Sequence, residues 1–296
     1  MLARDGPALA AAVRLRRAVF VDEQGIDPAV EADGQDPDAD HAVVLDGVGE
    51  ALATARLLDR GRTAVLGRVA VRRDARGRGL GTAVTRRLEH RAAERGLPAV
   101  EVHAQAAVEG FYRRQGYLAH GEPYFEAGLE HVSMRKELLP GLRPVRDEDG
   151  PALVHLIGSV WAEYPGMVLD VDREEPWLRA PASARAAAGA ALWVVADVRA
   201  CIGLRPLRPG AVELTTLYVA ATRRRQGWGA RLVWWVERAA RERGAGRVEL
   251  WSDRRFADAH RLYERLGYRA TGGTRELHDL SGTVERPFAK DLPPPA

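Results

Sequence analysis

Two short segments rich in arginine and glycine are the residues whose types and spacing point most directly to chemistry. They are Arg76-Gly-Arg-Gly-Leu-Gly81 and Arg224-Arg-Gln-Gly-Trp-Gly229. Glycines allow a tight turn and leave backbone N–H groups uncovered, so that several of them can converge on one anion. Arginine adds charge-assisted hydrogen bonds to phosphate oxygens. The two loops therefore predict binding sites for a phosphate or pyrophosphate group.

Other phosphate-binding motifs have a different spacing. The P-loop requires Gly-x-x-x-x-Gly-Lys-Ser/Thr, and neither segment contains lysine. The dinucleotide fingerprint Gly-x-Gly-x-x-Gly would need a glycine at Thr82, and the second segment also lacks the first glycine of that fingerprint. One such loop alone could be a solvated turn that binds no ligand. The recurrence of the loop in a second copy argues against that interpretation.

The two loops belong to a longer internal repeat. The offset that relates Gly79 to Gly227 also relates Glu94-Arg-Gly96 to Glu242-Arg-Gly244. Farther along, Phe111-Tyr-Arg-Arg-Gln-Gly-Tyr117 recurs as Leu262-Tyr-Glu-Arg-Leu-Gly-Tyr268 with a slightly larger offset. Spacing kept over three motifs indicates a tandem duplication, which suits a chain of 296 residues. Because Pro and Gly interrupt the chain near 140–141, the predicted domains are residues 1–138 and 142–292.

Each copy places its loop between a strand and a helix. In the first copy, strands are predicted at 68–71 and 100–103, one helix begins after the loop and a second begins at 108. In the second copy, strands are predicted at 212–219 and 247–251, and helices at 232–239 and 257–265. Upstream, each copy has a predicted helix (7–20; 151–161) and hairpin (41–58; 191–204), although the first copy has little room for an initial strand. This order predicts an α/β fold with one mixed sheet flanked by helices in each half.

Composition excludes several classes of protein. The net charge is only +3, and the two lysines, Lys136 and Lys290, form no basic tract, so no nucleic-acid partner is expected. No apolar run approaches the roughly eighteen residues that span a membrane, and the N-terminus does not resemble a secretory signal. Cys201 is the single cysteine, which excludes an internal disulfide. We expect a cytoplasmic protein that is a monomer or a homodimer. We expect no bound metal, because no His/Cys/Asp cluster has the spacing of metal ligands.

Both copies resemble the GNAT superfamily of acyl-CoA N-acyltransferases. The signature of that family is Gln/Arg-x-x-Gly-x-Gly/Ala, followed later by the tyrosine of Phe/Leu-Tyr-x-x-x-Gly-Phe/Tyr, and each half has both. The first copy also resembles the ElaA-like branch through Leu15-Arg-Arg-Ala-Val-Phe-Val-Asp-Glu-Gln24, His103-Ala-Gln105 and Gly128-Leu-Glu-His-Val-Ser-Met134. The resemblance covers nearly the whole chain. It implies two tandem GNAT-type domains, each with a mixed, mainly antiparallel sheet flanked by helices.

The same resemblance implies acetyl-CoA or CoA as co-substrate and a small-molecule or peptide amine as acceptor. The loops would hold the CoA pyrophosphate, and the strand before each loop would pair its backbone with the pantetheine arm. The residues assigned to CoA in this way are Val69, Ala70, Val71, Arg76, Gly77, Arg78, Gly79, Leu80, Gly81, Thr82, Leu217, Tyr218, Val219, Arg224, Arg225, Gln226, Gly227, Trp228, Gly229 and Ala230.

The resemblance also assigns chemical roles. Tyr112 and Tyr263 occupy the position that protonates the leaving thiolate, and a phenol with an ordinary pKa near 10 suits that role; the alternative is a buried core aromatic residue. Tyr117 and Tyr268 are expected to be packing residues. Glu213 is the predicted base of the second copy, with an exposed strand-end carboxylate as its alternative.

The first copy has no acid on the corresponding strand. Its candidate bases are His103 and His131, and either could instead be a structural histidine. The acids Glu23, Glu31, Asp33 and Asp36 could attract a cationic amine or could simply be solvated. The predicted function is N-acetyl transfer by direct attack of an amine on the thioester. The alternatives are a chain in which one half is an inactive scaffold, or a CoA-binding sensor or interaction module.

Overall fold

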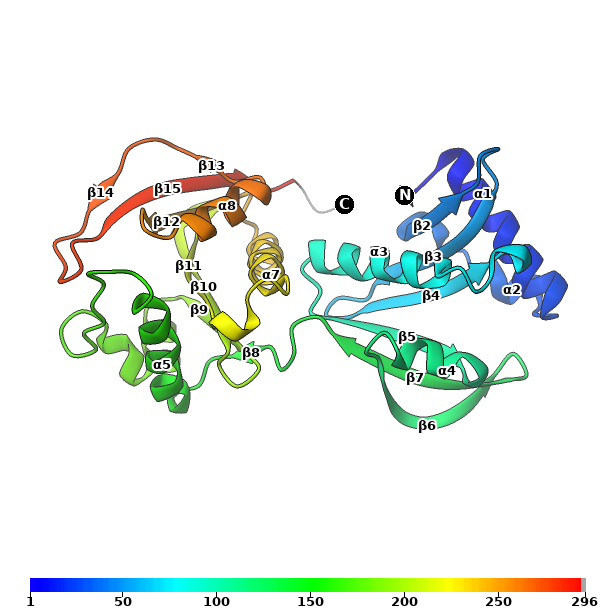
Figure 1. The fold of residues 1–296 in the computed structure, drawn as a ribbon, viewed down its shortest axis with the longest axis horizontal. Helices are drawn as coiled ribbons and strands as arrows, with labels where there is room; N and C mark the ends of the chain where they lie inside the picture. The colour runs from blue at the N-terminus through cyan, green and yellow to red at the C-terminus, as the bar shows by residue number, and fades with distance from the viewer. Residues whose placement is uncertain (294–296) are drawn as a thin grey trace. The chain divides into compact units, whose positions relative to one another are not determined.

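The computed structural model describes residues 1–293, which form two compact units, residues 1–138 and residues 139–293 (Figure 1). Each unit contains one mixed sheet flanked by helices, as the sequence predicted. Every strand pairing in the two sheets is antiparallel except β4 with β5 and β11 with β12. Within the described residues, no helix is both long and apolar enough to cross a membrane.

The N-terminal unit has a seven-stranded sheet in the order β1-β2-β3-β4-β5-β7-β6. Its strands are β1 (Leu2–Ala3), β2 (Asp40–Leu45), β3 (Ala51–Asp59), β4 (Ala64–Val71), β5 (Ala99–Gln105), β6 (Leu118–Glu126) and β7 (Leu129–Glu137). Its helices are α1 (Gly6–Arg16), α2 (Pro28–Glu31), α3 (Leu80–Glu94) and α4 (Glu109–Arg113). The first strand is short, as expected, whereas β4 begins earlier than predicted and α1 continues into a π-helical turn at Arg17–Glu23.

The C-terminal unit repeats this plan with an eight-stranded sheet whose main path is β13-β15-β12-β11-β10-β9-β8. Its strands are β8 (Arg143–Pro144), β9 (Ala191–Val195), β10 (Ala200–Arg208), β11 (Ala211–Val219), β12 (Arg247–Asp253), β13 (Arg269–Ala270), β14 (Arg275–Glu276) and β15 (Val284–Asp291). Its helices are α5 (Gly150–Trp161), α6 (Pro181–Ala187), α7 (Trp228–Glu242) and α8 (Ala257–Arg265).

Helices cover both faces of each sheet because successive strand residues point to opposite sides. On β4, Ala70 packs in the cluster under α1, whereas Val71 faces Gly81 at the start of α3. On β9, Leu192 belongs to the cluster under α5 and the next residue, Trp193, to the cluster under α7. The central strands β4 and β11 are therefore enclosed between two helices and end in the arginine- and glycine-rich loops.

The two lysines of the chain make equivalent contacts in the two units. Lys136 on β7 donates to Glu89 of α3 at 2.6 Å, and its ammonium lies 5.6 Å from the ring centre of Tyr117. The C-terminal unit repeats this arrangement with Lys290, Glu237 and Tyr268. Because Tyr117 is fully buried and Tyr268 is only 2% exposed, the prediction that both are packing residues is confirmed.

Candidate functional site

The loop of the N-terminal unit turns on glycines in the left-handed region. Gly77 has φ 75° and Gly79 has φ 77°, values that residues with a Cβ adopt only at a cost. Gly79 directly precedes α3, and no side chain caps that helix in the described structure. The first N–H groups of a helix have no intrahelical partner, and the helix dipole makes this end positive. The loop therefore has the local structure of an anion site.

The second loop has the same shape although its sequence differs. Gly227 has φ 81° and precedes α7, just as Gly79 precedes α3. Arg225 replaces Gly77 and adopts φ 60°, a strained value for arginine. The strain at this position points to a backbone geometry that the surrounding structure imposes on both loops.

The first arginine of each loop is bonded to the protein itself. The Nε atoms of Arg76 and Arg224 donate to the carbonyl oxygens of Val71 and Val219 at 3.1 and 3.0 Å. The terminal nitrogens then reach carboxylates near the end of the upstream helix, Glu23 for Arg76 at 2.7 Å and Glu163 for Arg224 at 2.6 and 2.7 Å. The sequence predicted that these arginines contact phosphate directly. Their contacts with the protein favour a role in closing the loop instead.

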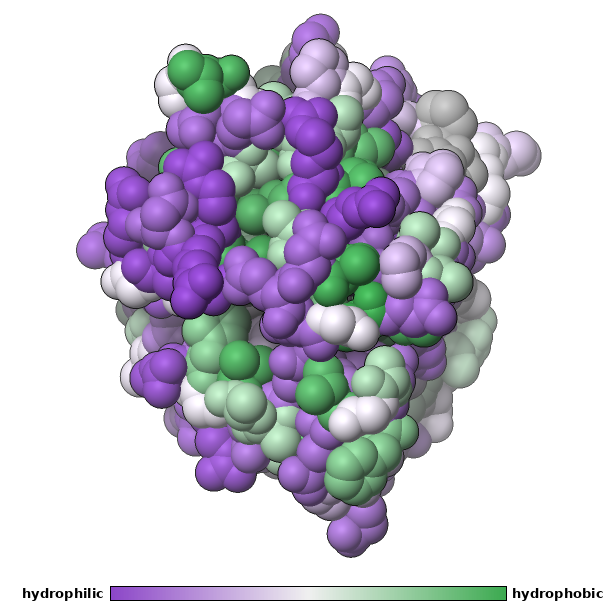
Figure 2. Space-filling view, turned by 90° about the vertical axis from the view of Figure 1, so that its right-hand side faces the viewer, coloured by the Kyte–Doolittle hydropathy of each residue, from purple (hydrophilic) through white to green (hydrophobic). Residues whose placement is uncertain are grey.

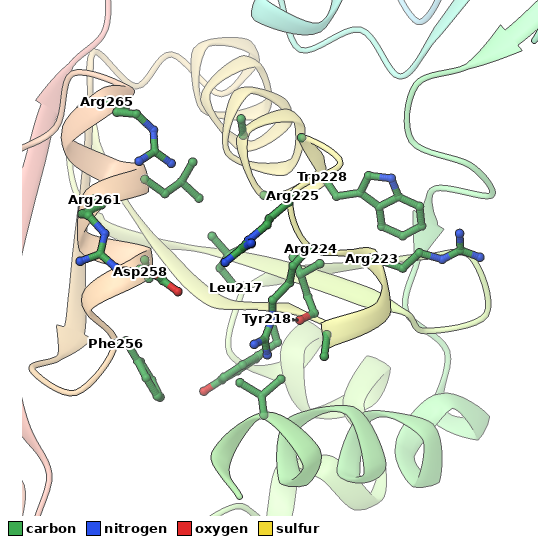
Figure 3. Close-up of a pocket in the computed structure, with 18 of the residues that line it drawn as sticks. Leu217, Tyr218, Arg223, Arg224, Arg225, Trp228, Phe256, Asp258, Arg261 and Arg265 are labelled. Carbon is green, nitrogen blue, oxygen red and sulfur yellow. Dashed lines mark hydrogen bonds and ion pairs between the residues drawn. The ribbon is translucent and has the colours of Figure 1, made fainter. Parts of the chain in front are cut away.

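A cavity of about 670 Å³ opens beside the second loop. Arg225 from the loop and Arg261 and Arg265 from α8 point into it (Figure 3). Val160, Leu217 and Phe256 line it with apolar surface. The cavity thus combines a cationic part with an apolar part.

Trp228, the variable residue of the second loop, also lines this cavity. The residue is only 6% exposed and belongs to the hydrophobic core that α7 forms with the sheet. The guanidinium group of Arg223 lies 5.4 Å from the centre of the ring. The tryptophan therefore fixes the start of α7 on the sheet while the loop backbone stays accessible.

The two central strands separate from their parallel neighbours just before the loops. β4 pairs with β5 at Ala64 and Val65, and β11 pairs with β12 only as far as Glu213. Beyond that point each strand has a bulge with a left-handed residue, Arg68 at φ 53° and Thr216 at φ 56°. The predicted pantetheine-pairing segments, 69–71 and 217–219, follow these bulges and have one edge free of the parallel partner. Backbone donors and acceptors on that edge are available to a bound amide.

In the N-terminal unit, a cavity of about 270 Å³ brings several predicted site residues together. Tyr112 from α4, His103 from β5 and Val69 from β4 all line it, and so does His131 from β7. The structure therefore joins the candidate proton donor, both candidate bases and the strand beside the loop in one place.

His103 has two hydroxyl partners that sequence reasoning missed. Its Nδ1 lies 2.9 Å from the hydroxyl oxygen of Tyr124 on β6 and 3.3 Å from that of Ser133 on β7. The ring of Tyr124 stacks on His131, with 5.9 Å between the ring centres. His131 itself bonds through Nδ1 to the carbonyl oxygen of Leu129. The imidazole of His103 is thus held by hydrogen bonds, whereas His131 serves the packing of the hairpin.

Both candidate tyrosines are more deeply buried than the sequence suggested. Tyr112 is 6% exposed and Tyr263 is 5% exposed, and burial raises the pKa of both phenols well above their usual value. The expectation of an ordinary pKa is therefore wrong, because apolar surroundings disfavour the phenolate. Tyr112 still lines its cavity, but Tyr263 packs on Tyr268 and Phe288 and is absent from the described residues that line the C-terminal cavity.

Glu213, the predicted base of the C-terminal unit, is buried and paired with an arginine. It is 5% exposed and accepts hydrogen bonds from Nε and a terminal nitrogen of Arg205 at 2.9 and 2.7 Å. Arg205 stands directly opposite it on β10, so the two side chains meet across the ladder. The described residues that line the C-terminal cavity do not include Glu213. The alternative of an exposed strand-end carboxylate is therefore wrong, because the side chain is buried.

Three of the four acids in the predicted acidic region of the first copy form an internal network, whereas the fourth, Glu23, pairs with Arg76. Glu31 bonds to the buried Arg16, and Asp36 bonds to Arg16 and to Arg56 at 2.9 Å each. Asp33 is held by Arg56 at 2.6 and 2.7 Å. The hydrogen bonds from Arg56 lower the pKa of the Asp33 carboxyl group far below its usual value. The prediction that these acids are simply solvated is wrong, because arginines from α1 and β3 neutralise them.

The lowered pKa of Asp33 gives a pH-dependent contribution to stability. A carboxylate with a depressed folded-state pKa stabilises the protein above its unfolded-state pKa, near 3.8, and this contribution is lost as the pH falls below that value. We expect Asp33→Asn to lose less unfolding free energy than the wild type between about pH 5 and about pH 3. Urea unfolding at a series of pH values measures this difference. Parallel pH curves for the two proteins would contradict it.

Two copies of a mixed sheet, each with a glycine-rich anion loop after its central strand, define a tandem acyltransferase fold. Family models match both halves: an acetyltransferase (GNAT) domain at residues 20–138 and the acetyltransferase (GNAT) family at residues 154–268. The chain belongs to the GNAT family and is an acyl-CoA N-acyltransferase with one family domain in each half.

Individual relatives cover about half of the chain. The uncharacterized protein YyaT of Bacillus subtilis is 33% identical over 130 residues, which are 43% of this chain and 87% of that protein. The uncharacterized N-acetyltransferase YjcF of the same organism is 30% identical over 138 residues, 46% of this chain and 98% of that protein. The crystal structure of Escherichia coli ElaA is 30% identical, covers 45% of this chain and 92% of that chain, and gives a TM-score of 0.42.

Proposed function

We propose that the chain transfers an acetyl group from acetyl-CoA to a primary amine by direct attack of the amine on the thioester, and that the N-terminal unit carries out this chemistry. The observation that carries the proposal is the N-terminal cavity, which Tyr112 and His103 both line together with Val69 of β4. We assign residues 1–138 to the catalytic domain and residues 142–292 to a second CoA-binding domain.

The residues of both units fit a CoA molecule. A pyrophosphate suits the backbone N–H groups of the two loops and the start of α3 or α7. The cationic part of the C-terminal cavity, with Arg225, Arg261 and Arg265, suits phosphate, and its apolar part suits the pantetheine arm. The segments 69–71 and 217–219 have backbone groups that can pair with the amides of that arm.

In the N-terminal unit, the amine nitrogen attacks the thioester carbonyl, so that an N–C bond forms and the C–S bond breaks. His103 accepts the proton that the amine loses, and Tyr124 and Ser133 keep its ring in place. Tyr112 donates its proton to the leaving sulfur as the C–S bond breaks. Afterwards the phenolate regains a proton from solvent and His103 releases one to solvent, so both residues return to their starting state. Because burial keeps this phenol protonated throughout the physiological range, the proton is available at each turnover.

The same geometry favours a scaffold role for the C-terminal unit. Tyr263 is packed away from the cavity, and Glu213 is engaged by Arg205. The unit nevertheless has a complete loop and a large cavity beside it. We therefore assign it CoA binding without acetyl transfer.

A matched pair of variants tests this division. Tyr112→Phe removes the proton donor without changing the ring, and we expect kcat to fall about 100-fold while the KM for acetyl-CoA stays nearly constant. Tyr263→Phe is the control and should keep kcat within about twofold. The measurement is CoA release over a panel of amines. Unchanged kcat in Tyr112→Phe, or a loss confined to Tyr263→Phe, would contradict the assignment.

A further inference from the structure

We infer that the C-terminal cavity contains a second anion subsite, formed by Arg225 and Arg265, that binds the 3′-phosphate of CoA. This inference rests on the proposed function, because it names the group by which the C-terminal unit selects its ligand. It follows from the strained backbone of Arg225, from the way in which the arginines of the cavity are paired, and from the charges that CoA carries.

Arg225 adopts a backbone conformation that glycine would adopt without strain. Its φ is 60°, whereas the equivalent position of the first loop is Gly77, with φ 75°. A residue with a Cβ pays for the left-handed region in free energy, and such residues cluster at functional sites. The first loop makes the same turn without any side chain at this position. The strain therefore points to a use for the guanidinium group of Arg225.

The guanidinium groups of Arg225 and Arg265 are left for a ligand. Both residues line the cavity, and Figure 3 shows Arg225 extending from the loop toward α8, which carries Arg265. Within the described residues, neither side chain makes a hydrogen bond, an ion pair or a ring contact. The other arginines of the described lining have partners in the protein: Arg223 over the ring of Trp228, Arg224 with Glu163 and Arg261 with Asp258. The pairing of Arg261 also neutralises the carboxylate that lines the cavity.

An arginine at the surface is by itself no evidence of a site, because charged side chains are common on this protein. Figure 2 shows one side of the molecule as a mainly hydrophilic surface with hydrophobic residues exposed in its middle. Arg225 and Arg265 differ from ordinary surface residues, since they come from two separate elements and line one cavity of about 670 Å³. Two guanidinium groups that share a cavity favour a bound anion.

The phosphates of CoA differ in charge. Each phosphate of the pyrophosphate has one ionised oxygen, and this group suits the backbone N–H groups of the loop, which need no arginine at the position of Gly77. The 3′-phosphate is a monoester and carries about 1.5 to 2 negative charges at pH 7. Two guanidinium groups match that charge, and each can donate two parallel hydrogen bonds to it. The monoester is therefore the group that we assign to Arg225 and Arg265.

Calorimetric titration with CoA and with 3′-dephospho-CoA tests the subsite, because the two ligands differ only in this phosphate. The protein is the full chain with Gly79→Glu, which blocks the N-terminal loop so that the C-terminal unit is titrated. We expect CoA to bind at least about 10-fold more tightly than 3′-dephospho-CoA, as for a charge-assisted hydrogen-bonded contact. Adding Arg225→Gly or Arg265→Gln should lower this ratio at least about threefold, and adding both should bring it to within about twofold of one.

Arg269→Gln is the matched control. Arg269 is an exposed residue of β13 in the same unit and is not among the described residues that line the cavity, so its loss should leave the ratio unchanged. Arg225→Gly should fold with a Tm near that of its parent, since glycine adopts this φ without strain.

Equal affinities of the Gly79→Glu parent for the two ligands would overturn the inference and leave CoA binding by the C-terminal unit intact. A parent-like ratio after both arginines are replaced would overturn it as well. If the Gly79→Glu parent binds no CoA, the proposed role of the C-terminal unit itself is wrong, and the inference falls with it.

Discussion

Replacing Gly79 by glutamate lowers turnover at least about 100-fold, whereas Gly227→Glu leaves turnover within about threefold, because only the first loop serves the catalytic cavity. Gly79 has φ 77°, so any residue with a Cβ is strained there. The added carboxylate would also lie at the start of α3, where it competes with the pyrophosphate for the same N–H groups. The loss should appear in the KM for acetyl-CoA as well as in kcat.

Calorimetric titration with acetyl-CoA separates the two loops. We expect two binding sites in the wild type and one remaining site in each variant. Gly79→Ala is the control for strain, since no atom lies within 4 Å of the Cβ it would add. Its turnover should fall less than that of Gly79→Glu, because alanine brings strain without charge. Equal losses of turnover in Gly79→Glu and Gly227→Glu would show that both units are catalytic.

The local parts of the site were predictable from sequence. A positive φ just before a helix is a local requirement that glycine meets at little cost. Gly79 and Gly227 therefore identified both loops from the sequence. The repeat predicted the strand and helix on either side of each loop, and the structure confirms that order. Arg225 is an exception, because its left-handed conformation is imposed by a loop shape that the sequence does not reveal.

The contacts that define the chemistry depend on cross-strand register, which sequence periodicity does not determine. Ser133 faces His103 because β7 pairs with β5 in one particular register, and Tyr124 reaches the same imidazole from β6. Glu213 was predicted as a base because it lies on the central strand. The register that sets it opposite Arg205 assigns it to an ion pair instead. Alternation of residues along β6 and β7 could have identified Tyr124 only if the hairpin register had been known.

Arg16→Met should destabilise the N-terminal unit by about 3–5 kcal/mol, the cost typical of breaking a buried ion pair by removing one partner. Arg16 is 1% exposed and its partner Glu31 only 6%, so the orphaned carboxylate has little access to water. Arg14→Met is the matched control on the same helix. The pair of Arg14 with Glu50 is more than half exposed on both sides, and its loss should cost no more than about 1 kcal/mol.

The distribution of tryptophan allows the two units to be followed separately. All seven tryptophans lie between residues 161 and 251, so their fluorescence reports the C-terminal unit, whereas far-UV circular dichroism reports both. In urea, Arg16→Met should move an early circular dichroism transition to lower denaturant and leave the fluorescence transition in place. Adding Glu31→Leu removes the orphaned charge and should recover part of the loss, because an apolar replacement of both partners avoids the desolvation cost. An equal shift of both transitions would mean that the network supports the whole chain and does not act within the N-terminal unit alone.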